Sequence, residues 1–367
     1  MRGPAVLTAL VLVVASCGGG EVPPASVDPD KASMPASIQR ADDTSVTISI
    51  VPKSLDNPVF MDTKTAAQQA AEDLGITVEW VAPYEADSAQ QVEIMHWLIN
   101  RGVDGILVSS NDPDALRDVI DLGIARGVQI ATFDSDSPES ERVFYVGTDN
   151  YHAGFVAGKT LVDILMTGKS PVGSDDPPDR RGRSVATGGT RGAGDLHDRR
   201  VETVILSGRR EAHNLNLRIA GFRDAVEEDL NVEIIDILYT DDNITRSIEL
   251  TEHVVRNRES LDAIFFTGGW PFMAPVDSME NYRQWLEGGG VAVTMDAHYP
   301  ILLAAQDGMV DGLVGQSFDE MGRVGVQKLY GAIQGEHVDE LIYTRSFRVT
   351  PENFDEHLTR ARNYELK

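Results

Sequence analysis

Side chains that can bind a polyhydroxylated molecule follow several short apolar segments of the sequence, each at the point where the segment ends. Carboxylates and amides form paired hydrogen bonds with hydroxyl groups, and aromatic rings cover apolar C–H faces. Each position alone also fits the N-cap of a helix. Together the positions predict a wet pocket with aromatic walls. The set comprises Lys53, Asn57 and Phe60 after TISIV, Ser109 at the end of DGILVS, Asp134 after VQIATF, Trp270 after DAIFFT, Asp296 after VAVTM and Gln316 after DGLVG.

The sequence contains no pattern typical of a catalytic or metal site. Its 8 His residues are scattered, without an HExxH pattern or a Cys–His pairing, and no G-x-S-x-G elbow is present. Asp134 and Asp136 alternate along an extended segment, so they are expected to face opposite sides rather than form an acid/base pair. GFVAGKT at 154–160 ends like a P-loop, but its glycines are too close together. We therefore expect a binding protein without metal or cofactor, not an enzyme.

The segments that position these side chains alternate between two patterns from residue 45 onward. Short runs rich in Val and Ile are followed by amphipathic helical patterns such as PDALRDVIDLGIARG. Continuous β-branched runs alternating with helices predict parallel sheets that are covered by helices on both faces. The runs are too many for the usual single sheet, so two doubly wound units fit better. Ligands bind at the carboxyl ends of such strands.

The composition is that of a globular protein. The chain has 367 residues, of which 42% are hydrophobic and 25% are charged, and the length suggests one large or two medium domains. Its formal net charge is -26. A surface this acidic repels phosphate backbones, so nucleic acid is not expected as a partner.

The N-terminal segment predicts export. An apolar run, AVLTALVLVVA, has the length of a signal-peptide core and ends in ASCGGG, which resembles a bacterial lipobox. The lipidated residue would be Cys17, the sole cysteine, and residues 1–17 would form the signal peptide. A signal cut elsewhere, which leaves a free thiol, is the alternative. Residues 18–44 have the composition of a flexible tether, and residues 168–200 that of a mobile surface insertion.

A series of motifs follows one order along the sequence. They are VPKSLDNPVF, RGVDGILVSSNDPDAL, GVQIATFDSDSP, YVGTDNYHAGFVAG, NLNLRIAGF, LDAIFFTGG, VAVTMDAH and GLVGQSFDEMG. In this order they resemble the ribose-type family of periplasmic sugar-binding proteins. The resemblance covers residues 45 to about 350 and implies two α/β lobes that close on a sugar around a hinge of three crossover segments. It also implies a monomer with an N-terminal lobe of 45–149 plus 317–343 and a C-terminal lobe of 150–316 plus 344–367.

The resemblance implies a role for individual residues. Ser109 lies near a family Asn, and Asn214 lies one helical turn before Arg218 on the same face. The residues that match family ligand positions are Asn57, Phe60, Asp134, Arg218, Asp296 and Gln316. The departures are Val59 in place of a frequent Phe, Ser135 in place of a frequent Arg, and Gly268 or Gly269, followed by Trp270, in place of Asn. Lys53 and the sequence FDSD look more like the rhamnose and autoinducer-2 receptors.

These observations predict an extracytoplasmic lipoprotein that binds a monosaccharide or related polyol and delivers it to an ABC permease of the inner membrane. A first alternative is a sensory receptor that presents a bound sugar or furanosyl signal to a membrane kinase or chemoreceptor. A sugar-responsive repressor is disfavoured because a signal and tether stand where a helix-turn-helix would be. The sequence leaves open the identity of the sugar, the membrane that carries the anchor, the role of residues 168–200, and the choice between transport and sensing.

Overall fold

The computed structural model describes residues 45–168, 200–227 and 231–365. The residues from Ser45 onward form one compact unit. The predicted signal peptide, tether and lipidation site at Cys17 lie outside the described residues, as does almost all of the predicted insertion. No helix within the described part of the chain is both long enough and apolar enough to cross a membrane.

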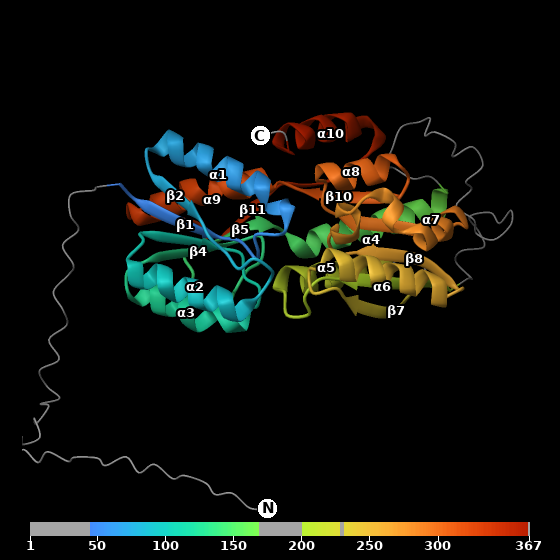
Figure 1. Cartoon of the computed structure of the whole chain (residues 1–367), viewed down its shortest axis with the longest axis horizontal. Coiled ribbons are helices and arrows are strands. Elements are labelled where there is room, and N and C mark those ends of the chain that lie inside the picture. The colour runs from blue at the N-terminus through green and yellow to red at the C-terminus, as the bar shows by residue number, and fades with distance from the viewer. Residues whose placement is uncertain (1–44, 169–199, 228–230, 366–367) are drawn as a thin grey trace, which may run out of the picture. The chain divides into compact units, whose positions relative to one another are not determined.

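Two six-stranded sheets organise this unit, one in each lobe (Figure 1). The first has the order β11-β5-β4-β3-β1-β2 and is parallel throughout. Its strands are β1 (Thr47–Val51), β2 (Thr77–Trp80), β3 (Gly105–Val108), β4 (Gln129–Phe133), β5 (Tyr145–Thr148) and β11 (Leu341–Thr344). The second has the equivalent order β12-β10-β9-β8-β6-β7. Its strands are β6 (Val201–Ser207), β7 (Val232–Tyr239), β8 (Leu261–Phe266), β9 (Val291–Met295), β10 (Gly312–Gln316) and β12 (Ser346–Arg348).

Helices cover both faces of each sheet because successive side chains of a buried strand point to opposite faces. In β3, Ile106 and Val108 pack with residues of α2 and α3, whereas Leu107 packs with residues of α1 and α9. The helices of this lobe are α1 (Met61–Leu74), α2 (Ser88–Arg101), α3 (Pro113–Ala125) and α9 (Phe318–Ile333). Those of the other lobe are α4 (Asn150–Thr167), α5 (His213–Glu227), α6 (Ile244–Asn257), α7 (Glu280–Glu287), α8 (Tyr299–Gln306) and α10 (Pro351–Glu365), together with the 3-10 helices η4 (Trp270–Met273) and η5 (Val276–Ser278).

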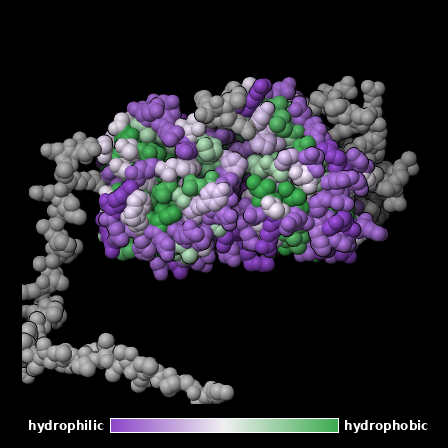
Figure 2. All heavy atoms as spheres, in the orientation of Figure 1, coloured by the Kyte–Doolittle hydropathy of each residue, from purple (hydrophilic) through white to green (hydrophobic). Residues whose placement is uncertain are grey.

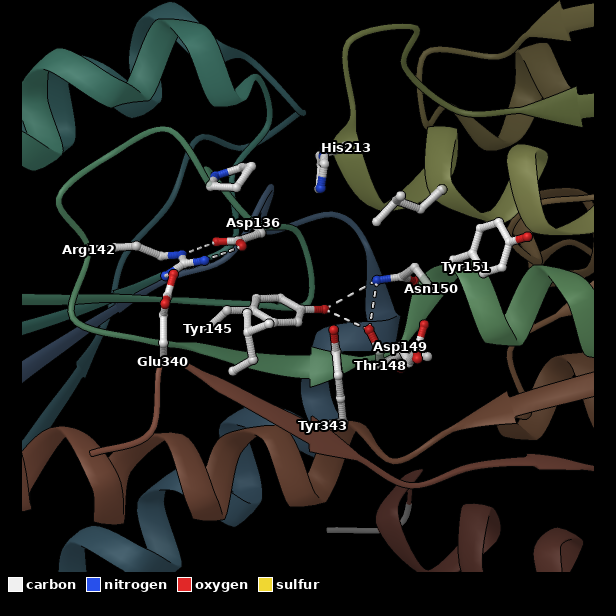
Figure 3. Close-up of a pocket in the computed structure, with 13 residues that line it drawn as sticks. Asp136, Arg142, Tyr145, Thr148, Asp149, Asn150, Tyr151, His213, Glu340 and Tyr343 are labelled. Atoms are coloured by element: carbon white, nitrogen blue, oxygen red, sulfur yellow. Dashed lines mark hydrogen bonds and ion pairs between the residues drawn. The ribbon is translucent and has the colours of Figure 1, made fainter. Parts of the chain in front are cut away.

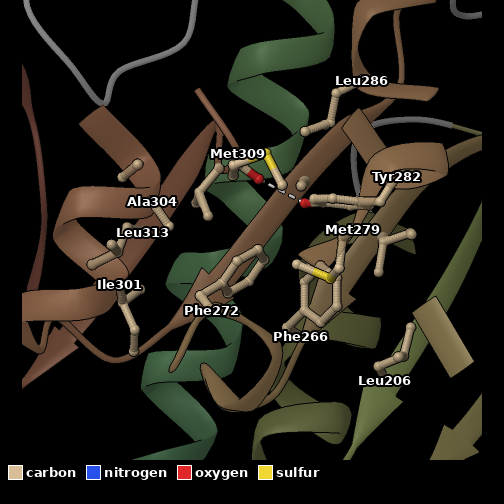
Figure 4. Close-up of a cluster of buried hydrophobic side chains, with 14 of the residues drawn as sticks. Leu206, Phe266, Phe272, Met279, Tyr282, Leu286, Ile301, Ala304, Met309 and Leu313 are labelled. Atoms are coloured by element: carbon tan, nitrogen blue, oxygen red, sulfur yellow. Dashed lines mark hydrogen bonds between the residues drawn. The ribbon is translucent and has the colours of Figure 1, made fainter. Parts of the chain in front are cut away.

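The core of the second lobe contains a group of aromatic side chains (Figure 4). Phe266 of β8 contacts Phe272 edge-to-face at a centroid distance of 5.0 Å and Tyr282 at 6.0 Å. The buried hydroxyl of Tyr282 donates to the carbonyl of Met309 at 2.7 Å, which satisfies the polar end of that ring. Hydrophilic residues dominate the described surface on the face drawn in Figure 2. The buried apolar side chains on both faces of each sheet therefore fix the sheet beneath the loops at its carboxyl edge.

Within the described residues, the chain passes between the two sheets at three places: between β5 and α4, between β10 and α9, and between β11 and β12. Helix α4 follows a strand of the first sheet but packs against the second, and α9 does the reverse. The predicted two-lobe fold with a three-segment hinge is thus confirmed. The residue boundaries of the lobes stay a prediction.

One strand differs from the parallel arrangement that the sequence predicts. Strand β12 pairs with β10 in antiparallel fashion. Only Arg345 separates it from β11, whose carboxyl end faces the second lobe. The chain therefore enters the second sheet from the carboxyl edge of its strands and runs against them.

Candidate ligand-binding site

The carboxyl edges of the two sheets enclose a small cavity of about 30 Å³ between the lobes. All of the predicted ligand-binding residues except Ser109 line it. The first lobe contributes Lys53, Asn57, Phe60 and Asp134, and the second contributes Asn214, Arg218, Trp270, Asp296 and Gln316. The fold thus brings together side chains that lie far apart in the sequence. This agrees with the rule that ligands bind at the carboxyl ends of parallel strands.

The loop after β1 presents Lys53, Asn57 and Phe60. Asn57 is the N-cap of the 3-10 helix η2 (Pro58–Phe60), and its Oδ1 accepts a hydrogen bond from the backbone N–H of Val59 at 3.2 Å. The ring of Phe60 contacts Phe133 and Phe318 edge-to-face, at centroid distances of 5.9 and 6.0 Å. Phe60 is therefore a core residue that also forms part of the cavity wall.

Asp134 and Asp296 occupy equivalent places at the ends of β4 and β9. Both have positive φ, 55° and 75° respectively, a conformation that Asp tolerates better than most residues. The Oδ2 atom of Asp134 accepts from the hydroxyl of Ser109 at 2.8 Å. Among the described residues, no backbone N–H donates to the Asp134 carboxylate, so the N-cap interpretation of this residue is wrong. Ser109 lies behind the cavity wall and orients Asp134.

Asp296, at the end of β9, has hydrogen-bond partners that differ from those of Asp134. Asp296 accepts from the backbone N–H of Gly269 at 3.1 Å and from the side-chain amide of Gln316. The helix that follows, α8, has His298 at its N-cap position. Asp296 therefore does not cap it and instead joins a network of side chains at the cavity.

Arg218 is the centre of this network. It is 2% exposed, and its guanidinium donates to Asn150 Oδ1 at 2.8 Å, the carbonyl of Thr267 at 2.7 Å and Gln316 Oε1 at 2.7 Å. The position of its helix depends on Gly154 in α4. A Cβ at Gly154 would lie 2.1 Å from the backbone oxygen of Arg218, so only glycine allows α4 and α5 to approach so closely.

Two hydrogen bonds join the lobes across the cavity. Lys53 Nζ donates to Asn214 Oδ1 at 3.2 Å, and Asn214 Nδ2 donates to Asp134 Oδ1 at 3.4 Å. The first is at the long end of the normal range and the second is longer than that range, so ligand hydroxyl groups could replace them.

The sequence analysis missed Asp242, which follows β7 and lines the cavity. Its Oδ1 atom is buried without a hydrogen-bond partner in the described structure, and its φ is 59°. Burial raises the pKa of the Asp242 carboxyl, and the nearby charges of Lys53 and Arg209 oppose that rise. The strand-end rule would have identified this residue if it had been applied to the segment VEIIDILYTDD. The sequence analysis also missed Leu215, Met273 and Phe318, which form an apolar wall of the cavity together with Val59.

Asp136 does not line this cavity. It forms a two-pronged ion pair with Arg142, at 2.5 Å to Nε and 2.7 Å to Nη2. Asp134 and Asp136 line different cavities, although the segment is not extended as expected, because Asp134 has a φ of 55°. No group of His, Cys, Asp and Glu within the described residues is arranged to hold a metal ion.

Comparison with known proteins identifies the family. Residues 48–337 match the model of the periplasmic binding protein domain. The chain belongs to this family. Members are solute-binding proteins, which act outside the cytoplasm and are not enzymes. The resemblance predicted from the sequence motifs is thus confirmed.

Individual relatives agree with this assignment. The ribose import binding protein of Bacillus subtilis (strain 168) is 19% identical over 337 residues, which cover 92% of this chain and 94% of the relative. A solute-binding protein of an ABC transporter from Burkholderia graminis, solved in complex with D-arabinose, is 27% identical with a TM-score of 0.71, covering 86% of this chain and 98% of that one. A glucose-galactose binding protein from Geobacillus stearothermophilus has the same fold, with 23% identity, a TM-score of 0.70 and coverage of 84% and 98%.

Proposed function

We propose that this protein binds a neutral monosaccharide in the cavity between its lobes and delivers it to an ABC importer. The observation that carries the proposal is the cavity itself, in which both lobes present charged and amide side chains together with Trp270. The ribose and D-arabinose named for two of the similar proteins make an aldopentose the first candidate.

The charges of the cavity favour a neutral ligand that donates hydrogen bonds. Three carboxylates line it, from Asp134, Asp242 and Asp296, against the two cations of Lys53 and Arg218. An anionic sugar would meet a surplus of negative charge. Hydroxyl groups instead donate to carboxylates and accept from cations, and such bonds are among the stronger ones in proteins. Trp270 would cover the apolar face of the sugar ring.

Binding requires the lobes to move. A cavity of about 30 Å³ has room for one or two water molecules, not for a sugar. The lobes must therefore part at the three crossovers, and the ligand then replaces the bonds from Asn214 to Lys53 and Asp134. The closed form is the one expected to engage a permease.

A sugar panel tests this proposal. Thermal unfolding is measured with D-arabinose, D-ribose, D-xylose, D-glucose and D-galactose, because a ligand that binds only the folded state raises the melting temperature. At least one sugar should do so. Starting from an open apo form, small-angle scattering with that sugar should give a smaller radius of gyration. If no sugar stabilises the protein, the proposed function is wrong.

Membrane attachment through lipid on Cys17 is part of the same proposal. The expected result is that the wild-type protein sediments with membranes, whereas Cys17→Ser is released or accumulates as an uncut precursor. Recovery of wild-type protein in soluble form, cut at another position, would contradict lipid anchoring and leave the sugar proposal intact. A sensory role in place of transport would follow if a permease deletion left the cellular response to the sugar unchanged.

A further inference from the structure

A second and larger cavity lies beside the hinge (Figure 3). Its volume is about 330 Å³, and it shares no lining residue with the cavity between the sheets. We call it the hinge cavity. The crossover between β5 and α4 forms part of its wall, β11 contributes Leu341 and Tyr343, and α5 of the second lobe closes one side through His213 and Leu217. The remaining wall includes Asp136, Arg142, Tyr145, Asp149, Glu340 and Tyr343.

We call the cavity between the sheets the sugar cavity, after its proposed ligand. It shares a wall of hydrogen-bonded residues with the hinge cavity. Asn150 and Thr148 line the hinge cavity, and they contact Arg218 and Gln316 of the sugar cavity, each at 2.8 Å. Tyr145 also lines the hinge cavity, and its hydroxyl donates to the backbone carbonyl of Asp134 at 3.1 Å. A molecule in the hinge cavity would therefore touch the side chains that hold the sugar-binding groups in place.

Exposed apolar side chains gather at this cavity. Tyr151, Leu341 and Tyr343 are 41%, 48% and 57% exposed and all line it. Tyr343 extends into this space from one side, and His213 points into it from the opposite side (Figure 3). Apolar surface left exposed in one hollow indicates a place where another molecule binds.

The charge of the hinge cavity favours a cation. Asp136, Asp149 and Glu340 carry three negative charges against the single positive charge of Arg142. Arg142 forms a close ion pair with Asp136 and a longer one, at 3.6 Å, with the largely exposed carboxylate of Glu340. Burial raises the pKa of the Tyr343 hydroxyl, and the negative charges of Asp149 and Asp136 raise it further. Burial lowers the pKa of His213, so its ring is neutral at pH 7 and does not repel a cation.

We propose that the hinge cavity binds a small organic cation, such as an alkylammonium, between the ring of Tyr343 and the carboxylates of Asp149 and Glu340. Aromatic faces together with carboxylates form the usual binding site for such groups. Because His213 and Leu217 of the second lobe close the cavity over these groups of the first lobe, the cation stabilises the closed arrangement and raises the affinity of the sugar cavity. The cation site does not depend on the proposed function. The effect of the cation on sugar affinity rests on the proposed function.

Choline is the probe for the first experiment, with 3,3-dimethyl-1-butanol as its neutral counterpart of the same shape. Titration calorimetry at low salt, without sugar, should show binding of choline and little or none of the alcohol. Tyr343→Ala should weaken choline binding roughly threefold to thirtyfold. Asp149→Asn should weaken it as well, because it removes a charge while Asn still caps α4.

Tyr84→Ala is the matched control, because Tyr84 is 71% exposed and does not line the hinge cavity. This variant should bind choline like the wild type. Equal binding of choline and the alcohol, or unchanged binding by Tyr343→Ala, would overturn the assignment of the site.

A second experiment measures the affinity for D-arabinose, or for whichever sugar of the panel binds, with and without saturating choline. Choline should tighten sugar binding, and the sugar should tighten choline binding by the same factor, because coupling between two sites is reciprocal. Independent affinities would refute the coupling but not the cation site. Failure of every sugar to bind would instead refute the proposed function.

Discussion

The two walls of the sugar cavity differ in how their polar groups are held. On the second-lobe wall, Arg218, Gln316 and Asp296 bond to one another and to residues at the crossovers. On the first-lobe wall, the ammonium of Lys53 bonds across the cavity to Asn214. One wall is therefore preorganised before any ligand arrives, whereas part of the other is positioned by closure. Preorganised groups contribute more affinity because little ordering cost remains to be met on binding.

This comparison predicts the largest effect at Arg218. Arg218→Ala should weaken sugar binding by two or more orders of magnitude, because it removes a charged donor and frees Gln316 and Asp296 to move. It should also lower the free energy of unfolding by about 1–3 kcal/mol, since buried acceptors lose their partner. Calorimetric titration and chemical denaturation measure the two effects. Arg223→Ala, an exposed position on the same helix, is the control and should change neither.

Asp134→Asn should have the next largest effect. Hydrogen bonds from ligand hydroxyls to an ionised carboxylate contribute roughly 1.5–3 kcal/mol, so binding should weaken by about one to two orders of magnitude. Asn tolerates the positive φ at this position, so the apo protein should remain about as stable as the wild type. Affinity unchanged from the wild type in calorimetry would remove Asp134 from the site.

Lys53→Met should have a smaller effect on affinity, about tenfold, and a distinct effect on conformation. Met fills a similar volume but cannot donate to Asn214, so one of the two bonds that join the lobes across the cavity is lost. The apo variant should therefore be more open, with a larger radius of gyration than the wild type by small-angle scattering. Equal radii would show that this bond does not hold the lobes together.

Asp242→Asn should give the smallest change, which is visible in the pH dependence of stability. The folded-state pKa of Asp242 is raised above its ordinary value of 3.8, so the unfolded chain loses the proton first as the pH rises. The free energy of unfolding of the wild type therefore falls as the pH rises from the pKa of Asp242 in the unfolded chain to its higher pKa in the folded protein. The variant lacks this loss, so without sugar it should be more stable than the wild type at pH 7 and similar to it near pH 4.

Asp241→Asn is the control for this comparison. Asp241 has a similar positive φ of 55°, but its carboxylate is paired with Arg246 at 2.7 Å and does not line the sugar cavity. Asp241→Asn should therefore not be more stable than the wild type at pH 7. A wild type that is more stable than Asp242→Asn at pH 7 would show that Asp242 has a stabilising partner in the folded protein.

The sequence by itself determined the lobes and most of the sugar-cavity lining. Buried β-branched strands that alternate with amphipathic helices form parallel sheets, and the residues after those strands must meet at one edge. This rule located Asp134, Trp270, Asp296 and Gln316 without any knowledge of packing. It also placed Ser109 near the site, although Ser109 bonds to Asp134 rather than lining the cavity.

Only the tertiary structure decided which groups pair, and therefore which are preorganised. Lys53 and Asn214 are 161 residues apart, and Arg218 and Gln316 are 98 apart, so no local pattern relates them. The hinge cavity likewise exists only because the crossover between β5 and α4, strand β11 and helix α5 converge beside it. Strand ends are fixed by a repeating local pattern. Pairing between side chains depends instead on how the two sheets face each other, and a one-dimensional pattern does not carry that geometry.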